Sequence, residues 1–478
     1  MLRDSYPYYL AGQAVAANTD LVVSNKYTGA PATRVARADR IAVEHAIASA
    51  AEAFSTTRRL PSHERQAVLQ HVVRRVTERH EELARALAVE AGKPIRDARG
   101  EVTRLADTFR IAAEEAVRIT GEWLPLDISP RATGYEAIVR RFPVGPCGFI
   151  TPFNFPMNLV AHKVGPAIAA GCPWVLKPAS ATPVGALILG DILTETDWPR
   201  AAFSILPCSG SEIEPLITDE RIKLLSFTGS PEVGWGLKAR AGKKRVTLEL
   251  GGNAACIVDE GVDLDYAADR ITIGAFYQSG QSCISVQRVL AHRAIYADLK
   301  VRLLERALKL RAGDPLDENT FLGPLISEAD ARRVEQWVDA AVSAGAKVLC
   351  GGRRKGTFYD ATYLEDVDPQ QNISCVEAFG PVATLQPFDR FADALRAAND
   401  SVYGLQAGVF TQNLDHAFAA YRELEVGGVI VNDMPSFRVD SMPYGGIKNS
   451  GFGREGVRYA IEEMTEPKLL VLNRAGSP

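Results

Sequence analysis

From Pro146 onward the sequence alternates short apolar runs with helical stretches, and this alternation restricts the possible folds more than any other feature. Repeated strand–helix–strand units predict a parallel sheet with helices on both faces, which places the chain in the α/β class. The strands end in Pro-rich or Gly-rich turns, where open sheets of this kind bind ligands. The predicted strands are 147–150, 174–176, 203–206, 222–227, 245–250, 255–258, 287–292, 347–349 and 429–431.

At 478 residues the chain is too long for one simple core, so we expect two or three domains. The net charge of −4 does not suggest a nucleic-acid partner or an anionic membrane. No segment resembles a signal peptide or approaches the roughly 20 apolar residues of a membrane span. Seven scattered cysteines without a Cys-x-x-Cys pair argue against disulfides and a metal site. We therefore expect a cytoplasmic protein with no membrane partner.

The region before residue 146 carries three other patterns. Residues 1–40 predict an arm with brief strands, and residues 40–118 predict helices, including a long one from Ser62 to about Gly92. Residues 121–141 alternate like an exposed hairpin, whose edge needs covering; a simple surface flap is the alternative. Farther along, Gly323-Pro324 is expected to begin another helix, and the helix before Cys283 is expected to run to Ser279.

The segment Gly280-Gln-Ser-Cys283, with Arg288 just beyond it, contains a candidate nucleophile. A single intracellular cysteine is more often a small core residue. A reactive thiol needs a base and donors for a developing negative charge. Glu249 at a strand end and Asn154 in an apolar turn supply these groups. Asn154 could instead be a turn residue and Glu249 a solvated carboxylate, although Gly251-Gly252 favours close backbone approach there.

These segments resemble those of NAD(P)-dependent aldehyde dehydrogenases, and the similarity extends from about residue 10 to about residue 470. The resemblance implies a Rossmann-like cofactor domain, an α/β catalytic domain and a projecting β-hairpin. The hairpin joins a C-terminal strand near 468–472 and builds a homodimer or homotetramer. We assign residues 1–120 and 142–250 to the cofactor domain, 251–445 to the catalytic domain, and 121–141 with 457–478 to the oligomerisation element.

The cofactor is expected to be NADP or NAD. Small residues in the segment 227–234, between a strand and a helix, suit a pyrophosphate at a helix N-terminus. The resemblance matches Lys177 to the ribose-binding lysine, and Glu377 and Phe379 to the nicotinamide site. NAD-selective relatives often carry glutamate where this chain has Ser180, so we expect NADP to be accepted and NAD to be usable. The cofactor-binding candidates are Thr151, Pro152, Lys177, Ser180, Gly210, Phe227, Gly229, Ser230, Gly234, Leu250, Glu377 and Phe379.

The resemblance also assigns catalytic roles. Cys283 attacks the aldehyde, the Asn154 amide and the Cys283 backbone N–H hold the alkoxide, and Glu249 activates water. Relatives that transfer the acyl group to coenzyme A usually lack this glutamate, so a free acid is the expected product. Glu455 matches a glutamate that assists proton movement, and Lys163 either joins it or extends its ammonium to solvent. A protein with vestigial activity and a coenzyme A-acylating enzyme are the alternatives.

The substrate is expected to be a small polar or anionic aldehyde. Asn154, Asn158 and His162 recur at intervals of four residues, which favours one polar side of a helix. The pattern is most similar to the lactaldehyde and non-phosphorylating glyceraldehyde-3-phosphate branch. Arg438 could pair with an anionic substrate, or it could form an ion pair with Asp440 or another carboxylate. The substrate candidates are Asn158, His162, Tyr277, Ser282, Ile284, Arg438 and Tyr444.

Overall fold

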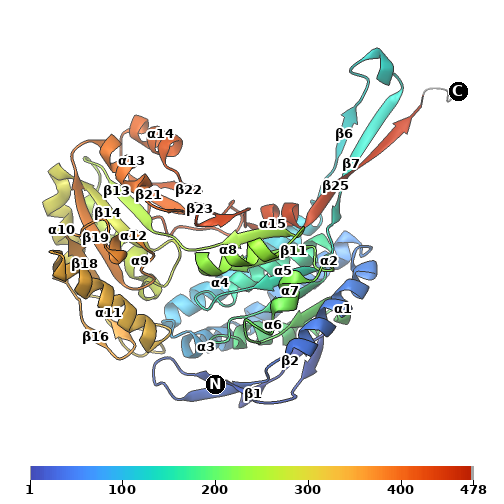
Figure 1. Ribbon diagram of the computed structural model, residues 1–478, viewed down its shortest axis with the longest axis horizontal. Coiled ribbons are helices and arrows are strands. Elements are labelled where there is room, and N and C mark those ends of the chain that lie inside the picture. The colour runs from blue at the N-terminus through green and yellow to red at the C-terminus, as the bar shows by residue number, and fades with distance from the viewer. Residues whose placement is uncertain (1, 475–478) are drawn as a thin grey trace.

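The strand–helix alternation builds two large sheets in the computed structural model, which describes residues 2–474 (Figure 1). The first sheet has eight strands in the order β24-β12-β11-β8-β9-β10-β2-β3, in which β24 spans Gly451–Phe452. Its central strands are all parallel, as predicted. They are β8 (Cys147–Ile150), β9 (Trp174–Lys177), β10 (Phe203–Ile205), β11 (Leu224–Thr228) and β12 (Arg245–Glu249).

The strand order of this sheet reverses beside β8. The chain adds β9 and β10 on one side of β8 and then places β11 and β12 on the other side. Loops that leave two adjacent parallel strands in opposite directions open a crevice at their carboxyl ends, and open α/β sheets bind ligands there. The crevice of this protein is therefore expected between the loops that follow β8 and β11.

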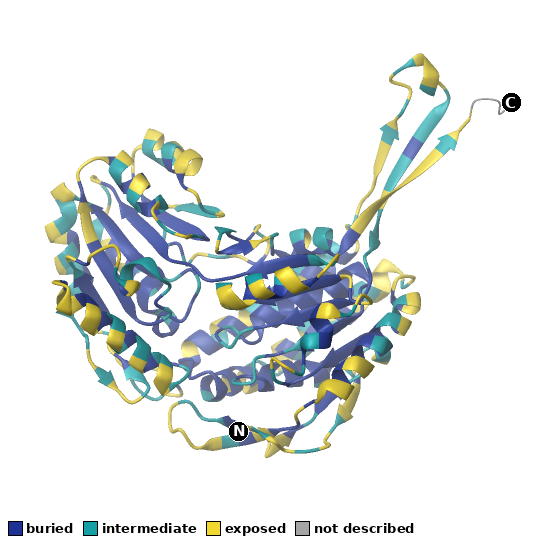
Figure 2. Cartoon of the chain, in the orientation of Figure 1, coloured by how far each residue is buried: buried dark blue, intermediate teal, exposed yellow. Residues whose placement is uncertain are grey.

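The second sheet has seven strands in the order β15-β18-β19-β14-β13-β21-β22, of which only β15 runs antiparallel to its neighbour. The central strands of both sheets are mostly buried, whereas the edge strands β3, β15, β22 and β24 are partly exposed (Figure 2). The strands are β13 (Ala254–Val258), β14 (Val286–His292), β15 (Lys347–Cys350), β18 (Thr362–Glu365), β19 (Val382–Phe388), β21 (Gln406–Phe410) and β22 (Gly428–Val431).

The first 116 residues form an arm of short strands followed by four helices, in agreement with their sequence patterns. The strands are β1 (Ser5–Tyr6), β2 (Tyr8–Leu10), β3 (Gln13–Val15), β4 (Leu21–Ser24) and β5 (Pro31–Val35). The helices are α1 (Arg40–Thr57), α2 (Ser62–Glu78), α3 (His80–Glu90) and α4 (Ile95–Ala116). The single long helix predicted after Ser62 is wrong, because Arg79 leaves helical geometry and separates α2 from α3.

Helices cover both faces of the sheets, and none within residues 2–474 has the length and apolar character to cross a membrane. The helix predicted to begin at Gly323-Pro324 begins instead at Glu328, so that prediction is wrong. The Ser327 hydroxyl caps this helix, α11, by accepting a hydrogen bond from the Asp330 N–H. The remaining helices are α5 (Asn158–Ala170), α6 (Val184–Leu193), α7 (Glu214–Thr218), α8 (Pro231–Arg240), α9 (Leu264–Phe276), α10 (Arg293–Ala307), α11 (Glu328–Ser343), α12 (Asn372–Cys375), α13 (Phe391–Asn399), α14 (Leu414–Glu423) and α15 (Val457–Glu463).

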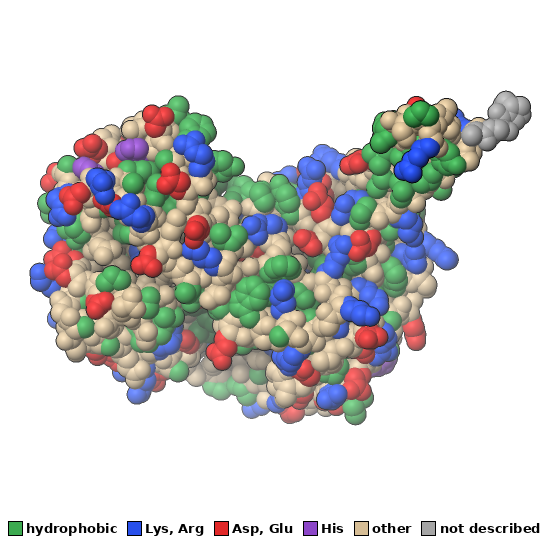
Figure 3. Space-filling model, turned by 45° about the horizontal axis from the view of Figure 1, so that its top comes forward, with side chains coloured by type: hydrophobic (Ala, Val, Ile, Leu, Met, Phe, Trp, Pro, Cys, Tyr) green, Lys and Arg blue, Asp and Glu red, His purple; other side chains and the backbone are tan. Residues whose placement is uncertain are grey.

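A three-stranded ribbon projects from the body of the molecule (Figure 1). It consists of β6 (Glu122–Pro125), β7 (Tyr135–Pro143) and β25 (Thr465–Asn473), which pairs with β7 along its whole length. This confirms the predicted hairpin and its C-terminal strand. Apolar side chains gather on the ribbon (Figure 3), and Trp123, Leu469 and Leu470 are each more than half exposed. Residues 475–478, assigned to the same element, lie outside the described residues.

Two buried carboxylates from the helical layer hold the N-termini of helices on the first sheet. Glu101 of α4 accepts hydrogen bonds from the backbone N–H groups of Met157 and Asn158, at 3.0 and 3.1 Å, where α5 has no cap of its own. Glu90 of α3 does the same for the start of α6. Lys93 pairs with Glu101, and both side chains are fully buried. A negative charge at a helix N-terminus is favourable, so these contacts set where α5 begins.

We expect Glu101→Gln to destabilise the protein by about 3–5 kcal/mol, because it leaves the Lys93 ammonium buried without a counter-charge. Thermal unfolding followed by circular dichroism measures this as a loss of several degrees in the melting temperature. Glu81→Gln is the matched control, since Glu81 makes ion pairs only at the surface and its loss costs less than about 1 kcal/mol. Equal melting shifts for the two variants would contradict the prediction.

Candidate active site

A cavity of about 680 Å³ opens at the carboxyl ends of β8, β11 and β12 and receives the loop that precedes β14. Its volume lies in the usual range for small-molecule sites. Most of its wall is formed by predicted site residues or their sequence neighbours. The predicted residues in the wall are Pro152, Asn154, Asn158, Gly229, Ser230, Glu249, Leu250, Tyr277, Ser282, Cys283, Ile284, Glu377, Phe379, Arg438 and Tyr444.

Cys283 follows a strained turn rather than a continuous helix. The predicted helix to Ser279 ends at Phe276, and Gln278, Ser279 and Gly280 all have φ between 51° and 70°. A Cβ at Gly280 would lie 2.1 Å from the Gly380 carbonyl oxygen, so only glycine fits. Strained backbone of this kind persists where the surrounding structure holds it.

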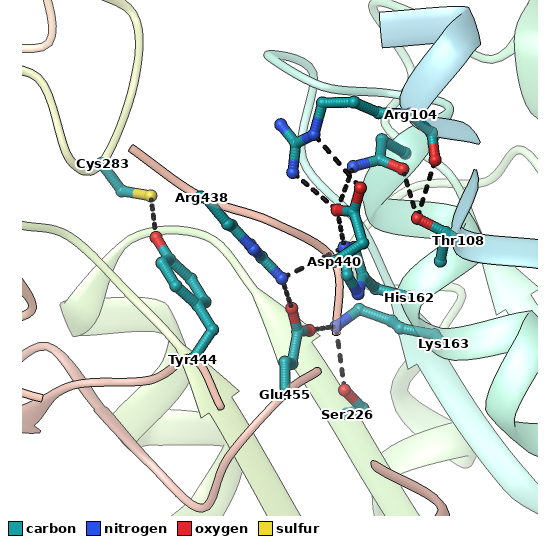
Figure 4. Close-up of polar contacts among 11 residues, drawn as sticks. Arg104, Thr108, His162, Lys163, Ser226, Cys283, Arg438, Asp440, Tyr444 and Glu455 are labelled. Atoms are coloured by element: carbon teal, nitrogen blue, oxygen red, sulfur yellow. Dashed lines mark hydrogen bonds and ion pairs between the residues drawn. The ribbon is translucent and has the colours of Figure 1, made fainter. Parts of the chain in front are cut away.

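The Cys283 thiol lies 3.0 Å from the Tyr444 hydroxyl (Figure 4). Burial raises the pKa of Cys283 to about 12, while the hydrogen bond from Tyr444 acts in the opposite direction. The thiol is therefore the resting form, and the thiolate needs additional positive charge. Arg288, which follows Cys283 in sequence, does not supply it: its guanidinium donates to the carbonyls of Asn253 and Ala398 outside the cavity.

Asn154 and the glycine pair after Glu249 bring the remaining groups close to Cys283. The Asn154 amide nitrogen donates to the Gln281 carbonyl at 3.1 Å, which ties its turn to the loop of the thiol. A Cβ at Gly252 would lie 2.1 Å from the carbonyl oxygen of Cys283. The close backbone approach predicted at Gly251-Gly252 is therefore confirmed.

Glu249 is a buried carboxyl group without a fixed partner. Only 3% of the residue is exposed, and neither carboxyl oxygen has a hydrogen-bond partner among the described residues. Burial and the nearby Glu455 carboxylate raise the pKa of Glu249 well above its ordinary value. A carboxylate whose pKa is raised binds a proton more strongly than an ordinary one, which is what a general base requires.

A buried ionic cluster of Lys163, Arg438 and Glu455, shown in Figure 4, lies near enough to Glu249 to influence its pKa. Lys163 donates to Glu455 at 2.7 Å and to the Ser226 hydroxyl at 2.9 Å, so its ammonium does not reach solvent. Arg438 contacts the other oxygen of Glu455 at 3.3 Å. Burial opposes ionisation of Glu455, yet Lys163 and Arg438 lower its pKa to about 2. Glu455 is therefore an anion that fixes two cations.

Arg438 pairs with Glu455, and Asp440 has other partners. Asp440 binds Arg104 at 2.7 Å and His162 at 2.8 Å. The Arg438 guanidinium lies 3.7 Å from the Tyr444 ring centroid, and its Nε is buried without a partner. Of the two alternatives for Arg438, the ion pair is present, and the side chain also lines the cavity.

The structure does not place residues 154, 158 and 162 together on one polar side of a helix, as was predicted. Asn154 precedes α5, which begins at Asn158. Asn158 lines the cavity and contacts Asp440 at 3.3 Å. His162 lies behind the wall on Asp440, and burial with the nearby Arg438 lowers its pKa and keeps the ring neutral. Arg104 of α4 lines the cavity instead, and the sequence patterns above did not point to it.

The turn after β11 suits a phosphate group. Ser230 precedes α8 without a side-chain cap, so N–H groups of its first turn remain free. A Cβ at Gly234 would lie 2.4 Å from the Leu250 side chain, which holds the helix close to the strand end. The buried hydroxyls of Thr151 and Thr228 have no partner among the described residues. The free donors and unpaired hydroxyls fit the expected dinucleotide.

Lys177, Ser180 and Gly210 lie outside the wall of the cavity. Lys177 ends β9, and its ammonium donates only to the Pro178 carbonyl, at 3.0 Å. Ser180 makes one long contact, 3.4 Å from its hydroxyl to the Cys208 carbonyl. Within residues 2–474, no carboxylate pairs with Lys177, so an anionic ligand could take that place.

Glu377 and Phe379 lie at the other side of the cavity, near Gly251-Gly252. The Glu377 carboxylate accepts a hydrogen bond from the Gly252 N–H at 2.9 Å, and burial raises its pKa to about 7. Phe379 packs edge-on against Phe153, with ring centroids 5.8 Å apart, and adopts a positive φ of 46°. This arrangement suits a ring and a hydroxylated sugar above Cys283.

Comparison with known proteins supports the resemblance to aldehyde dehydrogenases that the sequence indicated. The model of the aldehyde dehydrogenase family matches residues 14–470. A 3-sulfolactaldehyde dehydrogenase of Priestia aryabhattai is 45% identical over 469 residues, 98% of each chain. The structure of aldehyde dehydrogenase 21 from Physcomitrella patens with the reaction product succinate matches with a TM-score of 0.98 and 50% identity over 100% of both chains. A glyceraldehyde-3-phosphate dehydrogenase of Methanocaldococcus jannaschii complexed with NADP matches with a TM-score of 0.92 and 36% identity, over 96% of this chain and 100% of its own. The chain therefore belongs to the aldehyde dehydrogenase family.

Proposed function

We propose that this protein oxidises a small anionic aldehyde to the carboxylic acid with NADP or NAD, through a thioester on Cys283. The observation that carries the proposal is the single cavity that holds the Cys283 thiol and the unpaired, buried Glu249 carboxyl group. Because Asn154 also lines it, a vestigial role is disfavoured. The position of Glu249 disfavours transfer to coenzyme A, since that reaction needs no activated water.

Each residue has one task in the proposed reaction. The Cys283 thiolate adds to the aldehyde carbon, and the Asn154 amide and Cys283 N–H stabilise the alkoxide. A nicotinamide held beside Glu377 and Phe379 would supply the acceptor for the hydride lost by this carbon. The acyl group then remains on Cys283 as a thioester. Glu249 removes a proton from water as the water attacks the thioester. The acid is then released, and the Cys283 thiol is restored.

Glu455 acts through Glu249 and is a positioning residue. Its negative charge is one cause of the raised pKa of Glu249, and it orients Lys163 and Arg438. A carboxylate with a raised pKa is a stronger base than an ordinary carboxylate. We therefore assign Glu455 and Lys163 to tuning Glu249 and supporting its proton transfer.

Glu249→Gln is expected to keep one rapid turnover and lose the steady state, because hydride transfer precedes the step that needs the base. Stopped-flow absorbance should show a burst of reduced cofactor close to one equivalent per site, followed by a rate lowered by at least about 100-fold. Cys283→Ala is the control and should show neither phase. Loss of the burst in Glu249→Gln would mean that Glu249 activates the thiol.

The charges around the cavity favour an anionic substrate. Three cationic side chains, Arg104, Lys163 and Arg438, face two carboxylates, Asp440 and Glu455. Arg104 and Arg438 line the cavity wall, whereas their carboxylate partners Asp440 and Glu455 do not. The Nε of Arg438 is also without a hydrogen-bond partner within residues 2–474. The Priestia aryabhattai relative is named for a sulfonate-bearing aldehyde, and the Physcomitrella patens structure contains the reaction product succinate. Both agree with a substrate that carries an anionic group in addition to the aldehyde.

Arg104→Gln is expected to raise the KM for succinate semialdehyde by about 10-fold or more, as loss of a charged hydrogen bond costs about 1.5–3 kcal/mol. The KM for propanal should change less than about twofold, since propanal has no anionic group to lose a contact. Steady-state kinetics with both aldehydes measure the ratio. Arg96→Gln, on the same helix but outside the cavity, is the matched control. Equal changes for both aldehydes would rule out an anion contact.

Either cofactor can be used in our proposal, with NADP held by Lys177. Ser180→Glu should weaken NADP binding by at least about 10-fold, because a carboxylate would repel the 2′-phosphate and pair with Lys177. Ser180→Gln, which has the same shape without the charge, should bind NADP nearly as the wild type does. Fluorescence titration with NADP and NAD measures both affinities. Unchanged NADP affinity in Ser180→Glu would contradict this placement.

The ribbon and the cysteines support our proposals for the oligomeric state and the cellular compartment of the protein. We propose a homodimer or homotetramer in which the free edge of β25 and its exposed apolar side chains are covered by another subunit. All seven cysteines are free, which suits the reducing cytoplasm. We further propose that residues 1–120 and 142–250 bind the cofactor, that 251–445 carry the nucleophile, and that 121–141 with 457–478 assemble subunits.

A further inference from the structure

A second cavity, of about 360 Å³, lies at the root of the ribbon. Its wall combines the α1–α2 connection, the end of α4, the last residues of β7 and the end of α5. Asn158, at the start of α5, lines the active-site cavity, while Ala170, at its end, lines this one. A helix of 13 residues is about 20 Å long, so the two cavities are separate.

Five arginines line this second cavity, and no carboxylate does. None of them has an ion-pair partner within residues 2–474, although most other arginines of the described chain are paired with Asp or Glu. Solvent alone balances this charge at the wall of a confined space. Such an arrangement attracts anions. The five residues, called the arginine cluster below, are Arg58, Arg59, Arg65, Arg140 and Arg141.

Two members of the arginine cluster have a structural task. Arg65 donates to the Ala169 carbonyl near the end of α5, and Arg141 donates to the Glu462 carbonyl and the Thr465 hydroxyl at the end of α15. Even so, the Nε of Arg65 is buried and unpartnered, and burial lowers the pKa of Arg65. An anion near Arg65 would relieve this desolvation.

The other three members have no hydrogen-bond or ion-pair partner for their side chains within residues 2–474. Arg58 and Arg140 lie over the rings of Phe54 and Phe142, which keeps both guanidinium groups extended but leaves their N–H donors free. Arg59 makes no side-chain hydrogen bond or ion pair among the described residues. A guanidinium has five donors in a planar fork that matches the oxygens of a phosphate. The three side chains can therefore bind several phosphate oxygens.

The start of α2 adds to the positive potential. Ser62, its first residue, lines the cavity, and the preceding Pro61 provides no side-chain cap. The free N–H groups and the helix dipole of this 17-residue helix favour an anion at that end. The arginine cluster and the helix end thus converge on one cavity.

We propose that this cavity is a binding site for a small polyphosphate anion, such as a molecule that carries a pyrophosphate group. Five positive charges are more than a single phosphate would balance, and the volume exceeds what one phosphate fills. Because the site joins α2 and α4 to the root of β7, its ligand would brace the ribbon against the body. The inference is independent of the proposed oxidation, since no residue of the catalytic cavity takes part.

The test uses inorganic pyrophosphate as the probe and isothermal titration calorimetry of the whole protein at 0.15 M KCl. The wild type should bind with a Kd below about 100 µM, and Arg59→Gln/Arg140→Gln should weaken binding by at least about 10-fold. Both residues are exposed, so the variant should fold and keep its aldehyde kinetics. Arg74→Gln/Arg110→Gln removes the same charge from the neighbouring surface of α2 and α4 and should bind as the wild type does.

Two further measurements separate this site from others. Hydrogen exchange should slow at residues 119–121 and 140–143 when pyrophosphate is added, and saturating NADP should leave pyrophosphate binding unchanged. Displacement by NADP would place the probe in the dinucleotide site and overturn the proposal. Absence of pyrophosphate binding to the wild type would also overturn the proposal. A changed oligomeric mass in Arg59→Gln/Arg140→Gln would then assign the arginines to a subunit contact.

Discussion

The contact between Glu101 and the start of α5 is the interaction on which the site depends most. α5 carries Asn158, His162 and Lys163, and the turn before it carries Asn154. The helix has no N-terminal cap of its own, so a carboxylate from α4 supplies one across the interface. Lys93 neutralises Glu101 and also lies 4.1 Å from the Phe155 ring centroid. One buried ion pair thus fixes both the helix and the turn of the amide donor.

Electrostatic coupling gives two similar buried carboxyl groups different pKa values and therefore different roles. Glu455 and Glu249 are both fully buried carboxyl groups, yet their pKa values move in opposite directions. Glu455 has Lys163 and Arg438 as direct partners, whereas Glu249 has none and is repelled by Glu455. Two carboxyl groups with separated pKa values are the usual basis for assigning a fixed charge and a proton acceptor. The same cations leave the substrate end of the cavity positive.

The thiol is arranged to be inactive until the cavity is filled. Burial raises the pKa of Cys283 to about 12, and Tyr444 offers only a neutral donor at 3.0 Å. A cation beside the sulfur would favour the thiolate. The oxidised nicotinamide is positively charged, so cofactor binding and thiol activation are coupled in our proposal.

The sequence by itself determined the class of fold, the five parallel strands of the first sheet, the ribbon, and the group of Cys283, Asn154 and Glu249. In the second sheet it indicated β13, β14, β15 and β22 but missed β18, β19 and β21. Apolar runs and glycine turns are local, so a short window of sequence contains the information that places them. Only the tertiary structure decided that Arg438 meets Glu455, that His162 lies behind the wall on Asp440, and that Arg104 reaches the cavity from a helix more than 300 residues earlier than Asp440. The choice of partner for a buried charge depends on which chain segments pack together, and neither residue type nor spacing records it.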